Sequence, residues 1–253
     1  MNSARDALIV VLIMGCVAIL PNGPVTGQEK PSEKTPEKKT DALTDEKIEL
    51  NKALKTAASL GQVEKIKELL KQGADIQWRD ASDNGKTPLV KAVLGGRFEA
   101  VKVLLDSGAD LHYPDGSGRY PVYFCCIGSS VELLNYLLAK GGDKDLNSGP
   151  FSILVSICDH GQANAEFIPI LIKAGANPDE FKGHVSPLIA AIQLNPAYAG
   201  RAEKSRLYIK ALIENKADVN LKDKREKLSP LQWAKKRGDQ DIIEMLEKAG
   251  AKE

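Results

Sequence analysis

The sequence is poor in aromatic residues, with two Trp, six Tyr and five Phe in 253 residues. So few aromatic side chains argue against a stacking platform for single-stranded nucleic acid. The chain also lacks an excess of charge of one sign, because 35 Lys and Arg oppose 34 Asp and Glu and leave a net charge of +1. This balance disfavours nucleic-acid binding through bulk charge, and we predict no nucleic-acid partner.

Residues that carry catalytic or metal chemistry are equally scarce. His112, His160 and His184 have no short spacing that would bring two of them to one metal ion, and no Cys-x-x-Cys pair occurs. Phosphate-binding loops and dinucleotide fingerprints are also missing. Cys158 and His160 resemble a nucleophile beside its base, but residues two apart on a helix point in different directions. We therefore predict that the protein is not an enzyme and holds no cofactor and no metal.

The uncharged stretch near the N-terminus is too short to span a membrane comfortably. Ala7–Leu20 has 14 residues and would rise about 21 Å as a helix, against a hydrocarbon core of roughly 30 Å. Its length and the small residues before Gly27 are typical of a signal peptide over residues 1–27, and we predict an exported protein, periplasmic or secreted. Two alternatives remain open, an uncleaved anchor through residues 7–20 and acylation at Cys16, and only through these would the protein contact a membrane.

Residues 28–48 differ in composition from everything that follows. They mix Lys with Glu, contain Pro31 and Pro36, and hold few apolar residues. Such a segment cannot bury enough surface to offset its ordering entropy, so we predict a flexible charged linker ahead of a domain over residues 49–253.

The domain consists of six copies of one sequence motif. Residues 85–109 read GKTPLVKAVLGGRFEAVKVLLDSGA, and the same order of Thr-Pro-Leu, small residues, Gly, an apolar run and Gly recurs along the chain. Successive starts lie 35, 33, 32, 34 and 43 residues apart. The positions equivalent to Thr87 are Lys52, Tyr120, Ser152, Ser186 and Ser229.

Each unit encodes two short helices joined by a turn. Thr87 suits a helix N-cap, with Pro88 at the first helical position, where its missing N–H costs nothing. Leu89, Ala92 and Val93 then form one apolar face at helical spacing. Gly96 ends this helix, Val101, Leu104 and Leu105 provide the apolar face of a second one, and Gly108 ends the second. The polar stretch Tyr113–Arg119 is expected to project as a loop between units. Helices this short must bury their faces against neighbouring copies.

The chain resembles the ankyrin-repeat family, whose unit is about 33 residues and opens with Thr-Pro-Leu-His-x-Ala. The closest matches are Thr87-Pro88-Leu89, Ser186-Pro187-Leu188, Ser229-Pro230-Leu231, Gly73-Ala74-Asp75 and Gly108-Ala109-Asp110. The resemblance implies an all-α solenoid of about six helix-turn-helix repeats with projecting loops or short hairpins. Its repeats would cover roughly residues 49–82, 83–114, 115–147, 148–180, 181–223 and 224–253.

The fifth unit carries about nine extra residues, which we place in a loop within Pro196–Ser205. Insertions in solenoids map to loops on one face, often a binding face, but a surface loop also tolerates neutral insertion. The alternative function is therefore an exported enzyme or ligand-binding protein with its site at residues 196–205.

The family resemblance implies a non-catalytic module that binds an unidentified protein partner through loop tips and the exposed side of the first helices. Trp78 and Tyr113 could instead pack between neighbouring loops. The loop-tip positions carried over from the family are Trp78, Arg79, Asp80, Asn84, Tyr113, Asp115, Arg119, Phe181, Lys182, His184 and Arg225. The helix positions are Asp159, His160, Gln193, Lys236 and Arg237. Cys125, Cys126 and Cys158 are expected to be free, buried thiols, because neighbouring helices lie about 8–10 Å apart and a disulfide needs Cα atoms within roughly 7 Å.

Overall fold

The computed structural model describes residues 44–128, 130–150, 152–161, 163–194 and 200–253. The predicted signal peptide and most of the predicted linker lie outside these residues. Within them the chain is all-α, with isolated bridges Asp80–Lys86 and Lys182–Val185 in place of any named strand. The helices are α1 (Asp45–Leu60), α2 (Val63–Lys71), α3 (Pro88–Leu94), α4 (Phe98–Asp106), α5 (Pro121–Gly128), α6 (Val131–Ala139), α7 (Ile153–His160), α8 (Phe167–Lys173), α9 (Pro187–Gln193), α10 (Arg201–Glu214), α11 (Pro230–Arg237) and α12 (Gln240–Lys248), with 3₁₀ turns at Ala81–Asp83 and Gly142–Asp145.

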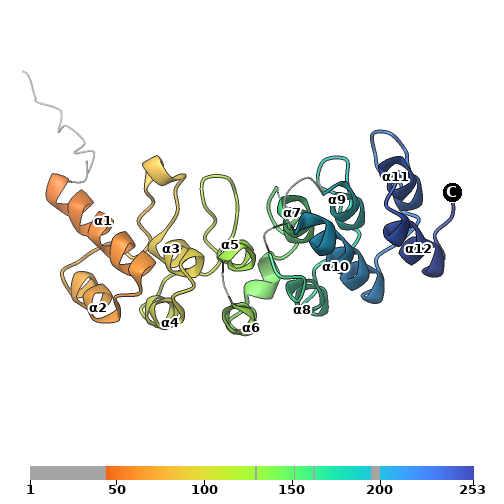
Figure 1. Ribbon diagram of the computed structural model, residues 1–253. Coiled ribbons are helices and arrows are strands. Elements are labelled where there is room, and N and C mark those ends of the chain that lie inside the picture. The colour runs from red at the N-terminus through yellow and green to blue at the C-terminus, as the bar shows by residue number, and fades with distance from the viewer. Residues whose placement is uncertain (1–43, 129, 151, 162, 195–199) are drawn as a thin grey trace, which may run out of the picture. The chain divides into compact units, whose positions relative to one another are not determined.

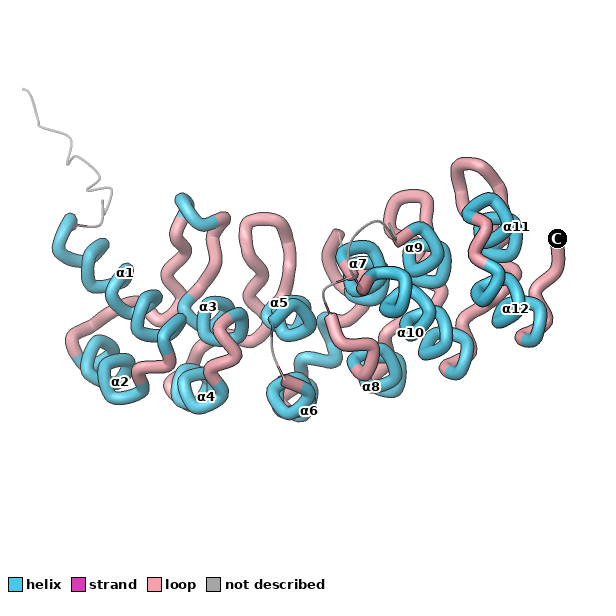
Figure 2. The backbone as a smooth tube through the Cα atoms, viewed as in Figure 1, coloured by secondary structure: helices cyan, strands magenta, loops and turns pink. Residues whose placement is uncertain are grey.

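The helices follow one another as six pairs, one pair for each predicted unit (Figure 1). First helices pack on first helices of adjacent units, as α1 does on α3, α3 on α5, α7 on α9 and α9 on α11. Hairpin-like loops project beyond the first helices (Figure 2). The predicted solenoid is therefore confirmed, with each pair buried mainly against its neighbours.

The predicted helix starts are confirmed in four of the units. Thr87, Ser152, Ser186 and Ser229 each accept a hydrogen bond from the backbone N–H three residues later. These side chains satisfy N–H groups that have no partner inside the helix. The prediction is wrong in the first unit, because α1 begins at Asp45 after the N-cap Thr44, and Lys52 lies inside the helix. Helix α1 thus begins within residues 28–48, the segment predicted as a linker.

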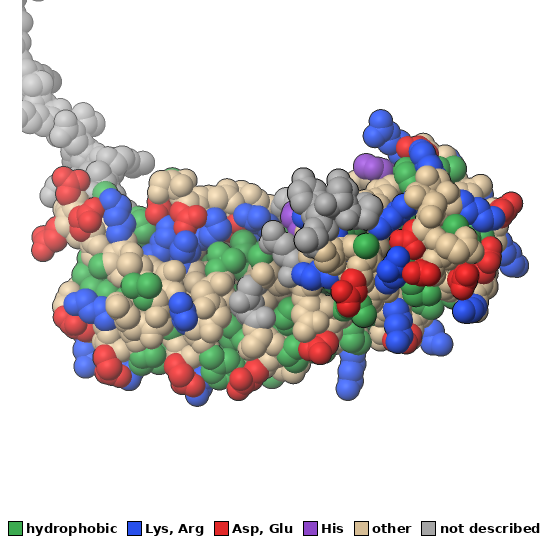
Figure 3. All heavy atoms as spheres, in the orientation of Figure 1, with side chains coloured by type: hydrophobic (Ala, Val, Ile, Leu, Met, Phe, Trp, Pro, Cys, Tyr) green, Lys and Arg blue, Asp and Glu red, His purple; other side chains and the backbone are tan. Residues whose placement is uncertain are grey.

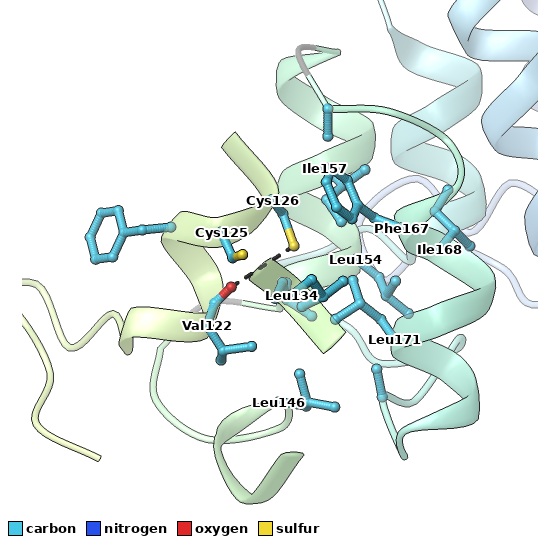
Figure 4. Packing of buried hydrophobic residues seen from close by; sticks show 14 of the residues in the cluster. Val122, Cys125, Cys126, Leu134, Leu146, Leu154, Ile157, Phe167, Ile168 and Leu171 are labelled. Carbon is cyan, nitrogen blue, oxygen red and sulfur yellow. Dashed lines mark hydrogen bonds between the residues drawn. The ribbon is translucent and has the colours of Figure 1, made fainter. Parts of the chain in front are cut away.

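The core contains the small residues that the motif places on the first helices. Cys125, Cys126 and Cys158 are buried and form no disulfide, as predicted. Figure 4 shows Cys126 facing Ile157 across the junction of the third and fourth units, with its thiol donating to the Val122 carbonyl at 3.9 Å. Burial raises the pKa of the Cys126 thiol well above its ordinary value. These thiols therefore act as compact apolar side chains.

The predicted insertion loop is wrong in its second half. Residues 201–205 form the first turns of α10, which has 14 residues. The Ser205 hydroxyl is buried and donates to the Ala191 carbonyl on α9 at 2.7 Å. The extra residues lengthen a helix because Arg, Ala, Glu and Lys favour helical conformation and because Ser205 finds a partner on α9. Residues 195–199 lie outside the described part of the chain.

Candidate functional site

The candidate site is the exposed side of the first helices together with the hairpins beside them, here called the first-helix face. Along this face the side chains near the ends of successive helices reach solvent. Most of these side chains are polar, whereas Leu60 and Ile127 are large, apolar and exposed. The exposed residues near the ends of α1, α5, α7, α9 and α11 include Leu60, Ile127, Asp159, His160, Gln193 and Lys236.

A small apolar cleft opens on this face between α5 and α7. Its volume is about 100 Å³, well below the roughly 300–1,000 Å³ of small-molecule sites. It is therefore suited to a single inserted side chain. The residues that line it are Arg119, Tyr123, Cys126, Ile127, Ile153, Ser156, Ile157, His160 and Ala163.

The sequence predicted the Arg119 and His160 rim of this cleft but missed its apolar lining. Ile127 is 43% exposed, although its counterparts in three other units, Asp159, Gln193 and Lys236, are polar. This position is polar in four of the other five units and is Leu94 in the second, so an apolar residue at a mostly polar repeat position was the available signal. Tyr123 and Ile153 could not be found this way, because their exposure depends on how closely two neighbouring units approach.

The aromatic residues of the first two hairpins are held by their neighbours. Trp78 is only 8% exposed, and the Lys55 ammonium lies 5.8 Å from its ring centre. The Arg79 guanidinium lies 5.3 Å from the ring centre of Tyr113 and donates through Nε to the Gly85 carbonyl at 3.3 Å. For Trp78 these contacts favour packing between hairpins, the alternative to a partner contact.

Two carboxylates of the first hairpin form ion pairs with neighbouring lysines. Asp80 accepts from Lys55 at 2.6 Å, and Asp83 contacts Lys55, Lys86 and Lys91 at 3.0, 2.8 and 3.1 Å. Burial alone would raise the pKa of Asp83, but the hydrogen bonds from the three lysines outweigh it and hold that pKa well below its usual range. Asp80, a predicted contact residue, is thus engaged inside the protein.

The first and second hairpins are joined through Asp115. This buried carboxylate accepts from Arg119 Nε and Nη2 at 3.0 and 2.7 Å, and from Asn84 Nδ2 at 3.0 Å. Asn84 also donates to the Ser117 hydroxyl at 2.8 Å. Burial acts to raise the Asp115 pKa, and the bonds from Arg119 and two backbone N–H groups bring it below its ordinary value. Three predicted contact residues therefore form one polar cluster that orients adjacent hairpins.

The fourth and fifth hairpins bring Phe181 and Lys224 together. The Lys224 ammonium lies 4.3 Å from the ring centre of Phe181, a cation–π contact. The Lys224 backbone N–H donates to the His184 carbonyl at 2.9 Å. Lys182 donates to the Gly149 carbonyl at 3.1 Å. The side chains of His184 and Arg225 are exposed.

The predicted helix positions separate into exposed and engaged residues. Asp159, Gln193 and Lys236 are exposed, and Lys236 pairs with a hairpin carboxylate, Glu226, at 2.8 Å. Arg237 instead reaches back to α9, where it donates to the carbonyls of Ile192 and Leu194, the latter at 3.0 Å. Arg237 thus closes the end of a helix in the preceding unit.

The structure separates Cys158 from His160, the two residues that resembled a nucleophile beside its base. Cys158 is fully buried with a raised pKa, while His160 is exposed and bonds the Ser156 carbonyl through Nδ1 at 2.9 Å. The two therefore do not form a nucleophile–base pair. No set of three potential metal ligands converges among the described residues, and none of their helices is long and apolar enough to cross a membrane.

Comparisons with known proteins agree with this architecture. A family model for ankyrin repeats in three copies matches residues 36–115 and 54–150. A crystal structure of an ankyrin repeat domain from Acinetobacter baumannii AYE is similar, with a TM-score of 0.66, 27% identity, and coverage of 79% of this chain and 98% of that one. A second crystal structure, of the ankyrin repeat protein EF0377, has a TM-score of 0.64 and 25% identity and covers 78% of this chain and 98% of that one. No curated protein matches the chain.

Proposed function

We propose that the chain is an exported, non-catalytic module of the ankyrin-repeat family that binds a protein partner through its hairpin tips and first-helix face. Ankyrin repeats generally serve as protein-interaction modules. The partner would meet the exposed helix ends and hairpins without contacting the second helices. Export rests on the signal-peptide pattern of residues 1–27, with retention as an anchor and acylation at Cys16 as the alternatives.

The observation that carries the proposal is the apolar cleft between α5 and α7. Tyr123, Ile127 and Ile157 line it. The residues equivalent to Ile127 in three other units, Asp159, Gln193 and Lys236, are polar and exposed. Apolar anchors that enter a pocket surrounded by polar residues are typical of energetically dominant positions in protein interfaces. The cleft therefore gives the proposed partner a place to bury one apolar side chain.

The fixed hairpins also support this proposal. Asp115 ties Asn84 to Arg119, and Asp83 ties Lys55 to Lys86 and Lys91, so adjacent hairpins are oriented before any partner arrives. A surface that is already ordered loses little conformational entropy on association. Rigid hairpins beside an apolar cleft suit recognition of one partner shape.

The test is binding by a matched pair of variants. Partners are captured by cross-linking in extracts of the native cell, identified by mass spectrometry, purified and titrated against the protein. Ile127→Asp places a charge at the cleft and should weaken binding at least about tenfold, or about 1.4 kcal/mol. Leu207→Asp makes the same change at an equally exposed residue, 47% against 43%, but on α10, and should leave affinity within about twofold.

Two results would contradict the proposal. One is the absence of any protein that binds the purified chain. The other is an equal loss of affinity in both variants, which would place the contact away from the first-helix face. Circular dichroism of both variants checks that neither has lost its helices.

A further inference from the structure

Basic side chains gather on the last hairpin and on α11. Residues 222–237 contain seven Lys and Arg against two Asp and Glu, whereas the whole chain has a net charge of only +1. Four of these cations lie on the hairpin, and all four are exposed. We call them the basic hairpin: Lys222, Lys224, Arg225 and Lys227. In Figure 3 Lys and Arg side chains lie at the end of the molecule that carries this hairpin, interspersed with Asp and Glu side chains.

The acidic residues of this region form no ion pair with the basic hairpin. Asp223 is 1% exposed and accepts the backbone N–H groups of Arg225, Glu226 and Leu228 at 2.8, 2.6 and 2.9 Å. It also accepts from Trp233 Nε1 at 3.1 Å. Its oxygens are thus occupied inside the hairpin, where they fix the turn.

The remaining carboxylates are paired with cations of α11. Glu226 bonds Lys236 at 2.8 Å, and Glu253 forms an ion pair with Lys235. Among the described residues, no carboxylate lies within ion-pair distance of the four basic-hairpin cations. Their charge is therefore available to a molecule that approaches from solvent.

The basic hairpin is also held in one conformation. Lys227 has a positive φ of 60°, and the Asp223 N–H donates to the Leu228 carbonyl at 3.0 Å. The Lys224 backbone is tied to His184, and its side chain lies over Phe181. Four exposed cations on one ordered turn concentrate positive charge, which fits a chain that carries several separate negative charges.

We infer that the partner presents an acidic segment, rich in Asp or Glu, to the basic hairpin. This inference rests on the proposed function and specifies the partner's chemistry. A nucleic acid fits less well, because the aromatic faces of Phe181 and Trp233 are already covered by Lys224 and Lys236 at 4.3 and 4.6 Å and offer no open stacking surface. A lipid surface also fits less well, because none of the large exposed apolar residues described, Leu60, Ile127 and Leu207, lies on this hairpin.

The experiment measures binding of a dye-labelled peptide of alternating Glu and Gly by fluorescence anisotropy at low salt. The same peptide with Gln in place of Glu is the probe control. The test variant reverses three charges of the basic hairpin, Lys224→Glu, Arg225→Glu and Lys227→Glu. The matched control, Lys65→Glu, Lys67→Glu and Lys71→Glu, changes net charge equally on exposed positions of α2.

We expect the Glu peptide to bind and the Gln peptide not to bind. The basic-hairpin variant should weaken binding at least about tenfold, and the α2 variant less than about twofold. Equal weakening in both variants would show attraction to overall charge and overturn the inference. So would binding that appears only with phosphatidylglycerol–phosphatidylcholine vesicles or a single-stranded DNA oligonucleotide.

The same variants distinguish this inference from the proposed function. If the captured partner is lost with Ile127→Asp but binds the basic-hairpin variant normally, the protein-binding function stands and the acidic-segment inference fails. If no protein partner is found but binding of the Glu peptide still requires the basic hairpin, the proposed function fails. The inference that this hairpin binds acidic segments then stands.

Discussion

At the scale of single residues, carboxylates organise the hairpins more than aromatic side chains do. Asp83, Asp115 and Asp223 each serve several donors, and each has a pKa below its ordinary value because these hydrogen bonds outweigh burial. A polar residue in a loop would ordinarily be assigned to solvent or to a partner. Here the same oxygens determine how the projecting hairpins are oriented.

Asp83 predicts a pH dependence of stability. Its pKa in the folded protein is lowered by Lys86, Lys55 and Lys91, so its ionised form is favoured more in the folded chain than in the unfolded one. The resulting stabilisation is complete above the unfolded pKa, about 3.9, and is lost as pH falls through the lower folded pKa. Between about pH 5 and pH 2, the free energy of unfolding should therefore fall less steeply in Asp83→Asn than in the wild-type protein.

Urea unfolding followed by circular dichroism over this range measures the difference. Asp106→Asn is the control, because Asp106 is exposed on α4 and lies outside the lysine cluster. Its profile should match that of the wild-type protein. Parallel profiles for Asp83→Asn and the wild-type protein would show that the cluster does not stabilise the fold.

At the scale of helices, the ends of the first helices are closed in two ways. Gly61, Gly161 and Gly238 end α1, α7 and α11 with a left-handed backbone, which glycine adopts without a steric penalty. Helix α9 instead ends at Leu194, with φ −54°, and its final carbonyls accept from Arg237 of the next unit. A side chain from a neighbouring repeat thus replaces the glycine turn.

Arg237→Ala should destabilise the fifth unit. Removing the guanidinium leaves the Ile192 and Leu194 carbonyls without this donor, and an unsatisfied buried polar group costs about 1–3 kcal/mol. We expect a lower free energy of unfolding and faster amide hydrogen exchange in the last turn of α9. Lys236→Ala, one residue away and exposed, should change neither. Equal amide exchange rates in the last turn of α9 in both variants would show that Arg237 does not stabilise the end of this helix.

The inserted residues of the fifth unit belong to the same scale. Their number and place followed from the repeat period, but their conformation did not. Residues 201–205 became helix because Ser205 reaches the Ala191 carbonyl of α9, a contact between segments that the period alone does not describe. No described residue of this segment favours a separate ligand or catalytic site, and that alternative remains a prediction for residues 196–205.

At the scale of the whole molecule, contacts run mainly between adjacent units. Stability is then close to a sum of unit and nearest-neighbour terms. A cavity should therefore act differently at the centre and at the end of the array. Leu154 on α7 and Leu246 on α12 are both fully buried and allow this comparison with the same substitution.

Leu154→Ala and Leu246→Ala should each cost about 2–5 kcal/mol locally. Hydrogen exchange measured by mass spectrometry should accelerate on both sides of α7 in the first variant. In the second it should accelerate only around α11, α12 and the adjoining α10. Acceleration of every helix by Leu246→Ala would contradict the nearest-neighbour description and indicate one cooperative unit.

The all-α solenoid, its six units and four of its helix caps could be predicted from the amino-acid sequence, because they follow from local spacing and backbone chemistry that recur in each copy. The start of α1 was predicted wrongly. The repeat period placed it at Lys52, whereas the helix begins at Asp45. Which side chains are accessible to a partner depended on the tertiary structure. Asp115 and Arg237 form hydrogen bonds between units, whereas Ile127 and the basic hairpin are exposed to solvent. The physical reason is that exposure and pairing depend on how adjacent units approach one another, and the repeat period specifies only that they are adjacent.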